Sequence, residues 1–280
     1  MVWGFSFVLV ALSLKAFQPL FVVWCRLLMG ALVMFCVCLL LRVELDLSLK
    51  FWSNVFVLSL TGNLLPFTLI ANAERVISSS EAGILMGFMP IATVLFSHWL
   101  LPNERLTWRR SIGVLLGILG VIILAGDGVY EFRKSENLHA RLAVLIAALS
   151  YAINGIYAKR IPGAHPIFLA FGTLFLGALL LLPAALSQQS SVKLLQLAPE
   201  ATLALFGLGV FATGLASWAY FVVVIQRGPA FLSVINYLIP CLAFFAGIVV
   251  LSEPWGWGHL AALICIAIGV WMIQMPERAN

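Results

Sequence analysis

The chain has 280 residues, of which 63% are apolar and only 10% are charged, and its mean hydropathy is +1.09. A soluble domain carries about 25% charged residues, so this composition excludes a water-soluble fold and indicates an integral membrane protein. The net charge of +5 comes from basic residues scattered through short connections, which argues for membrane topology and against nucleic-acid binding.

Long apolar segments follow one another along the whole chain. A helix needs about 20 residues to cross the hydrocarbon, and these segments lack the period-2 alternation of barrel strands. They lie near residues 2–18, 20–41, 53–73, 80–101, 108–126, 140–159, 165–187, 199–225, 229–251 and 256–275. We therefore predict an all-α integral membrane protein with ten transmembrane helices. The first segment has no basic n-region, so we expect it to remain as a helix and not to be a signal peptide.

A weak internal repeat divides the predicted helices into two units of five. Pro90 precedes Glu104 by 14 residues and Pro240 precedes Glu253 by 13, and a Thr-Gly pair stands 29 and 27 residues before the two prolines, at 61–62 and 213–214. The predicted units span residues 1–126 and 140–280, joined by a charged linker at 127–139. Because five is odd, the second unit enters the membrane from the opposite side, which is the inverted repeat of many secondary transporters.

A second spacing extends the repeat toward the start of each unit. Pro19 and Pro166 each lie 11 residues before a Gly-Ala-Leu, at Gly30 and Gly177. This alignment places Thr173 opposite Arg26, the single cation well inside a predicted helix, so symmetry does not require the charge. The planar guanidinium is a candidate anchor for an anion, but it could equally snorkel to the headgroups or bind helix carbonyls.

Basic residues in the short connections favour cytoplasmic termini. With the N-terminus inside, nine basic residues fall in cytoplasmic loops and six in external ones. Most tryptophans fall near predicted helix ends, where indole prefers the headgroup level. We expect a multi-pass protein of the plasma membrane, which in a bacterium is the inner membrane.

Short motifs recur at set places in both units. The first unit contains Leu64-Leu65-Pro66-Phe67, Glu81-Ala82-Gly83, Met89-Pro90, Asn103-Glu104-Arg105-Leu106-Thr107 and Gly117-Ile118-Leu119-Gly120-Val121, and the second contains Ser150-Tyr151-Ala152, Thr213-Gly214-Leu215-Ala216, Tyr237-Leu238-Ile239-Pro240 and Glu253. Over nearly the whole chain these motifs resemble the EamA-type transporters of the drug/metabolite transporter superfamily. The resemblance implies a ten-helix inner-membrane transporter of small organic metabolites, often an exporter, with relatives that move amino acids. The sequence departs from the family pattern at Ser252, where a glycine is usual, and at residues 254–257.

Ionisable groups are placed where a transporter, and not an enzyme, would have them. All 11 acidic residues fall in predicted loops or at helix ends, and the sequence has no nucleotide, metalloprotease or nucleophile-elbow motif. We therefore expect no catalytic residue, no cofactor and no metal. Proton relays normally need a carboxylate at the midplane, so we expect transport to run down the solute gradient or by exchange, with at most weak dependence on protons.

Uncharged polar and aromatic side chains inside the helices are the candidates for a substrate site. The predicted lining is Asn63, Phe67, Tyr151, Asn154, Trp218, Tyr220, Asn236 and Tyr237. Pro90 and Pro240 should kink their helices toward the bundle interior. Glu104 and Glu253, at opposite faces, are predicted to be structural or gating residues at the positive N-terminus of the helix that follows each. Helix–helix hydrogen bonds would satisfy the same polar groups, so that structural alternative stays open.

These observations predict a secondary transporter, an exporter of small organic metabolites such as amino acids, that works by alternating access around a midplane cavity. The alternatives are a non-transporting membrane protein, such as a lipid-site enzyme or an assembly scaffold, and a carrier of sugar nucleotides or phosphorylated metabolites. The expected partners are a small-molecule substrate and the lipid bilayer. The glycine-rich helices near 108–126 and 256–275 are candidates for packing or for a homodimer contact outside the cavity.

Overall fold

The computed structural model describes residues 2–100, 107–127, 135–158, 161, 165–188, 198–227 and 229–274, with the side chains at 100, 125–127, 135–136, 224–227 and 229–237 excepted. Across these ranges all regular structure is helical. Seven helical stretches are long and apolar enough to cross a membrane, namely Pro19–Leu40, Leu49–Ala73, Ser79–Trp99, Asn137–Ala158, Pro166–Gln188, Pro199–Val223 and Trp257–Gln274. Two shorter apolar helices are Val2–Leu14 and Leu238–Leu251.

The elements follow the predicted segments closely. The first half contains α1 (Val2–Leu14), α2 (Pro19–Leu40), α3 (Leu49–Ser59), η1 (Leu60–Leu64), α4 (Leu65–Ala73), α5 (Ser79–Met86), α6 (Met89–Leu100) and α7 (Trp108–Asp127). The second half contains α8 (Ser135–Ala158), α9 (Pro166–Gln188), α10 (Pro199–Gly209), η4 (Val210–Leu215), α11 (Ala216–Arg227), α12 (Pro229–Leu251) and α13 (Trp257–Gln274). Helix α8 begins at Ser135, within the range predicted as a linker.

Helix starts follow local capping chemistry. Pro19 occupies the first turn of α2, where a missing N–H costs nothing. The Ser48 side chain accepts a hydrogen bond from the Phe51 N–H (3.2 Å) and caps α3. The side chain of Ser78 does the same for α5, accepting from the Glu81 N–H at 3.1 Å.

The two predicted kink prolines behave differently. Ahead of Pro90 the helix is interrupted at Gly87 and Phe88, which separates α5 from α6. Pro240 lies inside α12, which continues from Pro229 to Leu251 without interruption. The tight turn before Pro90 is closed by hydrogen bonds from the Gly87 N–H to the Ile84 carbonyl (2.9 Å) and from the Phe88 N–H to the Leu85 carbonyl (3.0 Å).

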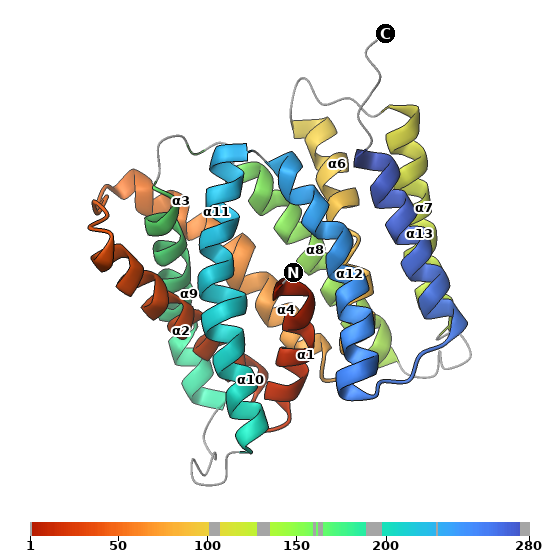
Figure 1. Cartoon of the computed structure of the whole chain (residues 1–280), viewed down its shortest axis with the longest axis horizontal. Coiled ribbons are helices and arrows are strands. Elements are labelled where there is room, and N and C mark those ends of the chain that lie inside the picture. The colour runs from red at the N-terminus through yellow and green to blue at the C-terminus, as the bar shows by residue number, and fades with distance from the viewer. Residues whose placement is uncertain are drawn as a thin grey trace.

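The two halves of the sequence are interlocked and do not form separate globules. One apolar core joins α2 and α3 of the first half to α9, α10 and α11 of the second. The other core joins α4 to α7 of the first half to α8, α12 and α13 of the second. Figure 1 shows α2, α3 and α9 at one edge of the bundle and α7 and α13 at the other. Motion of one half relative to the other would therefore change the contacts in both cores.

Glycines let α7 and α13 pack closely against each other. A Cβ at Gly113 would lie 2.5 Å from the Gly269 carbonyl oxygen, and one at Gly269 would lie 2.6 Å from the Gly113 oxygen. At Gly120 a Cβ would lie 2.9 Å from the Ala262 oxygen. The glycines predicted to serve packing or a homodimer contact thus serve a contact within one chain.

Candidate functional site

Both Thr-Gly pairs of the internal repeat lie in π-helical turns inside long helices. Thr61-Gly62 falls in η1, between α3 and α4, and Thr213-Gly214 falls in η4, between α10 and α11. A π-helical turn widens the helix and disrupts the regular backbone hydrogen bonds, and such turns are frequent at functional sites. In a membrane the freed carbonyls need partners from neighbouring helices.

Side chains of α8 supply those partners at η1. The Asn154 amide nitrogen donates to the Leu58 carbonyl and to the Thr61 hydroxyl, both at 3.0 Å. The Ser150 hydroxyl donates to the Thr61 carbonyl at 2.8 Å. Gly62 makes this approach possible, because a Cβ there would lie 2.6 Å from the Asn154 nitrogen. Asn154, predicted as a substrate ligand, therefore holds the helix of the other half.

Residues from the start of the chain do the same at η4. The Trp3 indole N–H donates to the Ala212 carbonyl at 3.0 Å, and its ring meets the Tyr220 ring edge-on at 6.0 Å. Helix α2 approaches through Gly30, whose added Cβ would lie 3.1 Å from the Gly214 nitrogen. Each π-helical turn contacts the first two helices of the opposite half, which are α8 and α9 at η1 and α1 and α2 at η4.

Arg26 of α2 is buried at this contact. Its side chain is 5% exposed, its Nε donates to the Thr213 hydroxyl at 3.0 Å, and its guanidinium carbon lies 3.6 Å from the centroid of the Phe67 ring. Among the described residues no carboxylate forms an ion pair with it. The structure therefore contains a buried cation that touches both halves and keeps donors for an anion.

Some of the predicted lining residues gather around this cation. Phe67 packs edge-on against Tyr151 with centroids 6.4 Å apart, and the Tyr220 hydroxyl donates to the Asn154 carbonyl oxygen at 3.4 Å. Asn63 is 8% exposed and makes no side-chain hydrogen bond with any described residue. The half-buried Trp218 packs on the core of α2, α9 and α10. The Asn236 and Tyr237 side chains, and all of Glu104, lie outside the described residues.

The N-terminus of α5 is held by two residues of the second half. The Glu253 carboxylate accepts from the Ser79 N–H at 2.8 Å, from the Ser80 N–H at 2.9 Å and from the Ser80 hydroxyl. We predicted that Glu253 would meet the helix that follows it, but these hydrogen bonds run to α5. A carboxylate at this end of a helix is stabilised by the positive end of the helix dipole.

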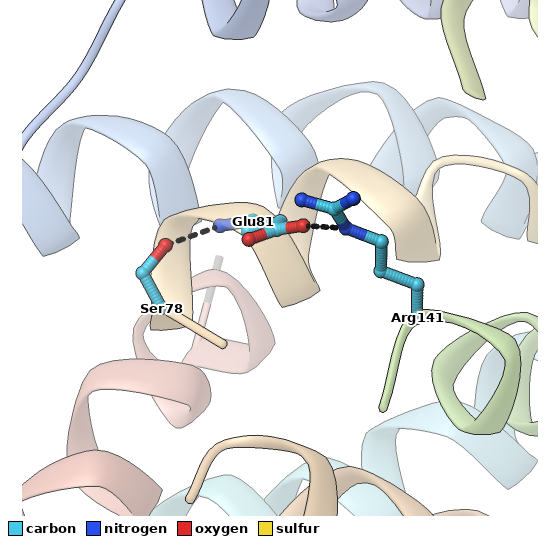
Figure 2. Close-up of polar contacts among 3 residues, drawn as sticks. All are labelled: Ser78, Glu81 and Arg141. Atoms are coloured by element: carbon cyan, nitrogen blue, oxygen red, sulfur yellow. Dashed lines mark hydrogen bonds and ion pairs between the residues drawn. The ribbon is translucent and has the colours of Figure 1, made fainter. Parts of the chain in front are cut away.

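The second residue is Arg141 of α8, which the sequence analysis did not single out. Figure 2 shows its guanidinium against the carboxylate of Glu81, whose backbone N–H is capped by Ser78. The two side chains are 15% and 10% exposed. The pair joins residues 60 apart in sequence, so no local pattern could have found it. We call the first turn of α5, together with its partners Glu253 and Arg141, the α5 latch. It joins the first half to the second.

Beside the α5 latch, Glu74 ends α4. Its backbone N–H continues the helix by donating to the Ile70 carbonyl at 2.9 Å. Both carboxyl oxygens are buried without a hydrogen-bond partner. Burial, and after it the nearby Glu253 carboxylate, raise the pKa of Glu74 well above its ordinary value, while Arg26 acts in the opposite direction.

Comparison with known proteins agrees with this architecture. The EamA-like transporter family matches residues 1–126 and 139–275. Two Bacillus subtilis proteins named uncharacterized transporters are similar: YoaV is 24% identical over 97% of this chain and 92% of its own length, and YcxC is 29% identical over 95% and 87%. A Chlamydia muridarum protein named S-adenosylmethionine/S-adenosylhomocysteine transporter is 24% identical over 99% and 89%. A solved crystal structure that is 20% identical shares the fold, with a TM-score of 0.70 over 97% of this chain and 95% of that one. The chain belongs to the EamA-like transporter family and is a multi-pass membrane protein.

Proposed function

We propose that the protein is a secondary transporter that exports small organic metabolites bearing a carboxylate, such as amino acids, by alternating access between its two halves. In this proposal ten helices cross the bacterial inner membrane as two inverted five-helix units, with both termini in the cytoplasm. The separate family matches to residues 1–126 and 139–275 support the two units.

The observation that carries the proposal is the buried Arg26 at the contact between the halves. It donates to Thr213 of the second half and stacks on Phe67 of the first, so a ligand there would be sensed by both. Its fork of donors can bind a carboxylate through two hydrogen bonds. The two π-helical turns, one of which contains Thr213, are segments that can change local register, which suits a moving interface.

The same observation argues against a carrier of phosphorylated solutes. A phosphate with two charges is expected to need several cations, and Arg141, a mostly buried cation beside α5, is already neutralised by Glu81. The Chlamydia relative is named for solutes that contain an amino-acid carboxylate, which supports a carboxylate-bearing substrate here.

Counterflow in proteoliposomes tests the function. Vesicles preloaded with one unlabelled solute are given the same solute in radiolabelled form, across a panel of L-amino acids, S-adenosylmethionine and nucleotide sugars. We expect accelerated entry for at least one carboxylate solute in wild type, loss of that entry in Arg26→Gln, and no loss in a matched surface control, Arg75→Gln. Counterflow of nucleotide sugars alone, or of nothing in the panel, would contradict the proposal.

A further inference from the structure

Glu74 is a buried carboxyl group that the fold does not use. It stands at the C-terminal cap of α4, and neither carboxyl oxygen has a hydrogen-bond partner in the described part of the chain. Its neighbour Glu253, in contrast, uses both oxygens on the N-terminus of α5. An ionised carboxylate without hydrogen bonds or a paired cation is strongly disfavoured when it is buried, so such a group favours its protonated form.

Glu74 and the ring on which Arg26 packs lie on the same side of α4. Phe67, on which the Arg26 guanidinium lies, precedes Glu74 by seven residues. Seven residues turn a helix to about 20° short of two full turns and rise about 10 Å, so positions 67 and 74 share one side. The two charges act on each other electrostatically but are not in ion-pair contact.

The other ionisable groups on the elements around Glu74 have identified roles or positions. Glu81 of α5 is paired with Arg141 of α8, and Glu253 is bound to the first turn of α5. Tyr151 of α8 lies beside Phe67. Lys15 after α1, Arg75 next to Glu74 and His139 of α8 are exposed. Arg26 is therefore the buried cation, among the described residues, that a carboxylate at Glu74 would partly balance.

A count of charges at the pair shows what a solute carboxylate would do. With Glu74 ionised, the two residues together carry no net charge, and an incoming carboxylate would leave the buried site with a net negative charge. With Glu74 protonated, Arg26 is an unbalanced cation, and the same carboxylate makes the site neutral. Because uncompensated charge inside a membrane protein is costly, carboxylate and proton favour each other's binding, and this linkage is reciprocal.

We propose that Glu74 is the proton-binding residue of this transporter and that a solute carboxylate at Arg26 crosses the membrane together with a proton at Glu74. This inference rests on the transport function proposed above, and it replaces our expectation of weak proton dependence. Downhill efflux of such a solute would carry protons out with it.

Flux measurements test the linkage with 3-phenylpropionate, a carboxylate with an aromatic ring and no ammonium group. We expect its apparent KM in wild-type proteoliposomes to rise about tenfold per pH unit above the pKa of Glu74, as a single linked proton requires. Glu74→Gln, which mimics the protonated acid, should keep a low KM at every pH and should no longer respond to an imposed proton gradient. Glu44→Gln, a change at an exposed carboxylate, should behave as wild type. A wild-type pH profile in Glu74→Gln would overturn the proposal.

A measurement without solute separates failure of this inference from failure of the transport function. A carboxyl whose pKa is raised by folding stabilises the protein at low pH and loses that contribution as pH rises through the folded-state pKa. The melting temperature of detergent-purified wild type should therefore fall over that range relative to Glu74→Gln, and Glu44→Gln should follow wild type. If the wild-type and Glu74→Gln curves run parallel, Glu74 is not the proton site, whatever the counterflow panel shows. If Glu74 titrates as expected but no carboxylate solute is transported, the proton site stands and the transport proposal fails.

Discussion

Helix α2 packs against η4 in the second half much as α9 packs against η1 in the first, yet the chemistry of the two contacts differs. At one, Gly30 allows close approach and Arg26 donates to the Thr213 hydroxyl at 3.0 Å. At the other, Gly177 allows close approach and the Ser59 hydroxyl donates to the Thr173 carbonyl at 2.7 Å. Arg26 and Thr173 occupy equivalent positions, four residues before the two glycines.

The comparison separates what the fold needs from what it does not. A neutral hydrogen bond from Ser59, the last residue of α3 before η1, holds α9 here, so an arginine is not required to hold a helix in this place. A buried cation without an ion-pair partner carries a desolvation penalty that a threonine avoids. Under the proposed function, Arg26 serves a ligand, whereas Thr173 serves packing. The predictions below test this separation.

The largest effect should follow from removing the charge. Arg26→Met keeps much of the side-chain volume but loses the donors to a solute carboxylate, and losing one partner of a buried charge pair costs about 2–5 kcal/mol. We expect counterflow of the carboxylate solute to fall by roughly 100-fold or more. Because apolar replacements of buried charges are often neutral or stabilising, the melting temperature in detergent should not fall.

The equivalent change in the other contact, Thr173→Val, is the matched control. Thr173 contributes its carbonyl to Ser59, and its hydroxyl donates to the Ala170 carbonyl of its own helix at 3.1 Å, so loss of the hydroxyl should alter transport less than about threefold. Equal losses in both variants would show that the two positions share a structural role.

The glycines of the two π-helical turns should differ in stability. A Cβ at Gly62 would lie 2.6 Å from the Asn154 amide nitrogen, whereas a Cβ at Gly214 would come no closer than 3.2 Å to the Gly30 Cα. Gly62→Ala must displace an amide that holds η1, so we expect a loss of about 2–3 kcal/mol in unfolding experiments in detergent. Gly214→Ala should lose about 1 kcal/mol. A larger loss in Gly214→Ala would mean that η4 is the tighter contact.

Much of the helix placement could be predicted from the sequence, because long apolar runs, Pro19 at a helix start and serine caps are local signals. The Thr-Gly pairs were found as repeats, but their π-helical geometry was not. That geometry depends on Asn154 and Trp3, which arrive from helices distant in sequence. Local sequence patterns cannot reveal partners that lie far away in the sequence.

The candidate site was predicted less completely for the same reason. Phe67 and Tyr151 do meet, and Asn154 bonds to the Leu58 carbonyl. Glu74 lies at the end of α4, in line with the expectation that acidic residues fall in loops or at helix ends, but the burial of its carboxyl group was not predicted. Nothing in the sequence around Glu74 shows that its carboxyl oxygens become buried beside α2 and the α5 latch. Arg141 has its partner in Glu81 through tertiary contact alone.

The partners of the two π-helical turns allow a finer comparison. Asn154 makes two hydrogen bonds to η1 and the turn before it, and Trp3 makes one to the Ala212 carbonyl of η4. Each such bond contributes about 1 kcal/mol net, so Asn154→Ala should destabilise by about 2 kcal/mol and Trp3→Phe by about 1 kcal/mol. Thermal unfolding of the purified variants measures both. Retention of counterflow in Asn154→Ala would agree with a structural role for Asn154, and complete loss in a well-folded variant would make it a substrate ligand.

The smallest effect concerns the residue before each repeat glutamate, which is Asn103 in the first half and Ser252 in the second. Ser252 has φ of 54°, in the left-handed region that glycine and asparagine adopt more readily than serine. There the chain leaves α12 and turns back, so that the Glu253 N–H donates to the Gly247 carbonyl at 3.3 Å and its carboxylate reaches α5.

Ser252→Gly should therefore stabilise the protein by about 0.5–1 kcal/mol, which is the strain relieved minus the extra conformational freedom of the unfolded chain. Ser252→Ala keeps the Cβ and should gain nothing, which separates backbone strain from loss of the hydroxyl. Glycine favours the conformation that the turn already has when Glu253 is bound to α5. Counterflow should therefore stay the same or slow slightly. A destabilised Ser252→Gly would show that the serine is held in this conformation without strain.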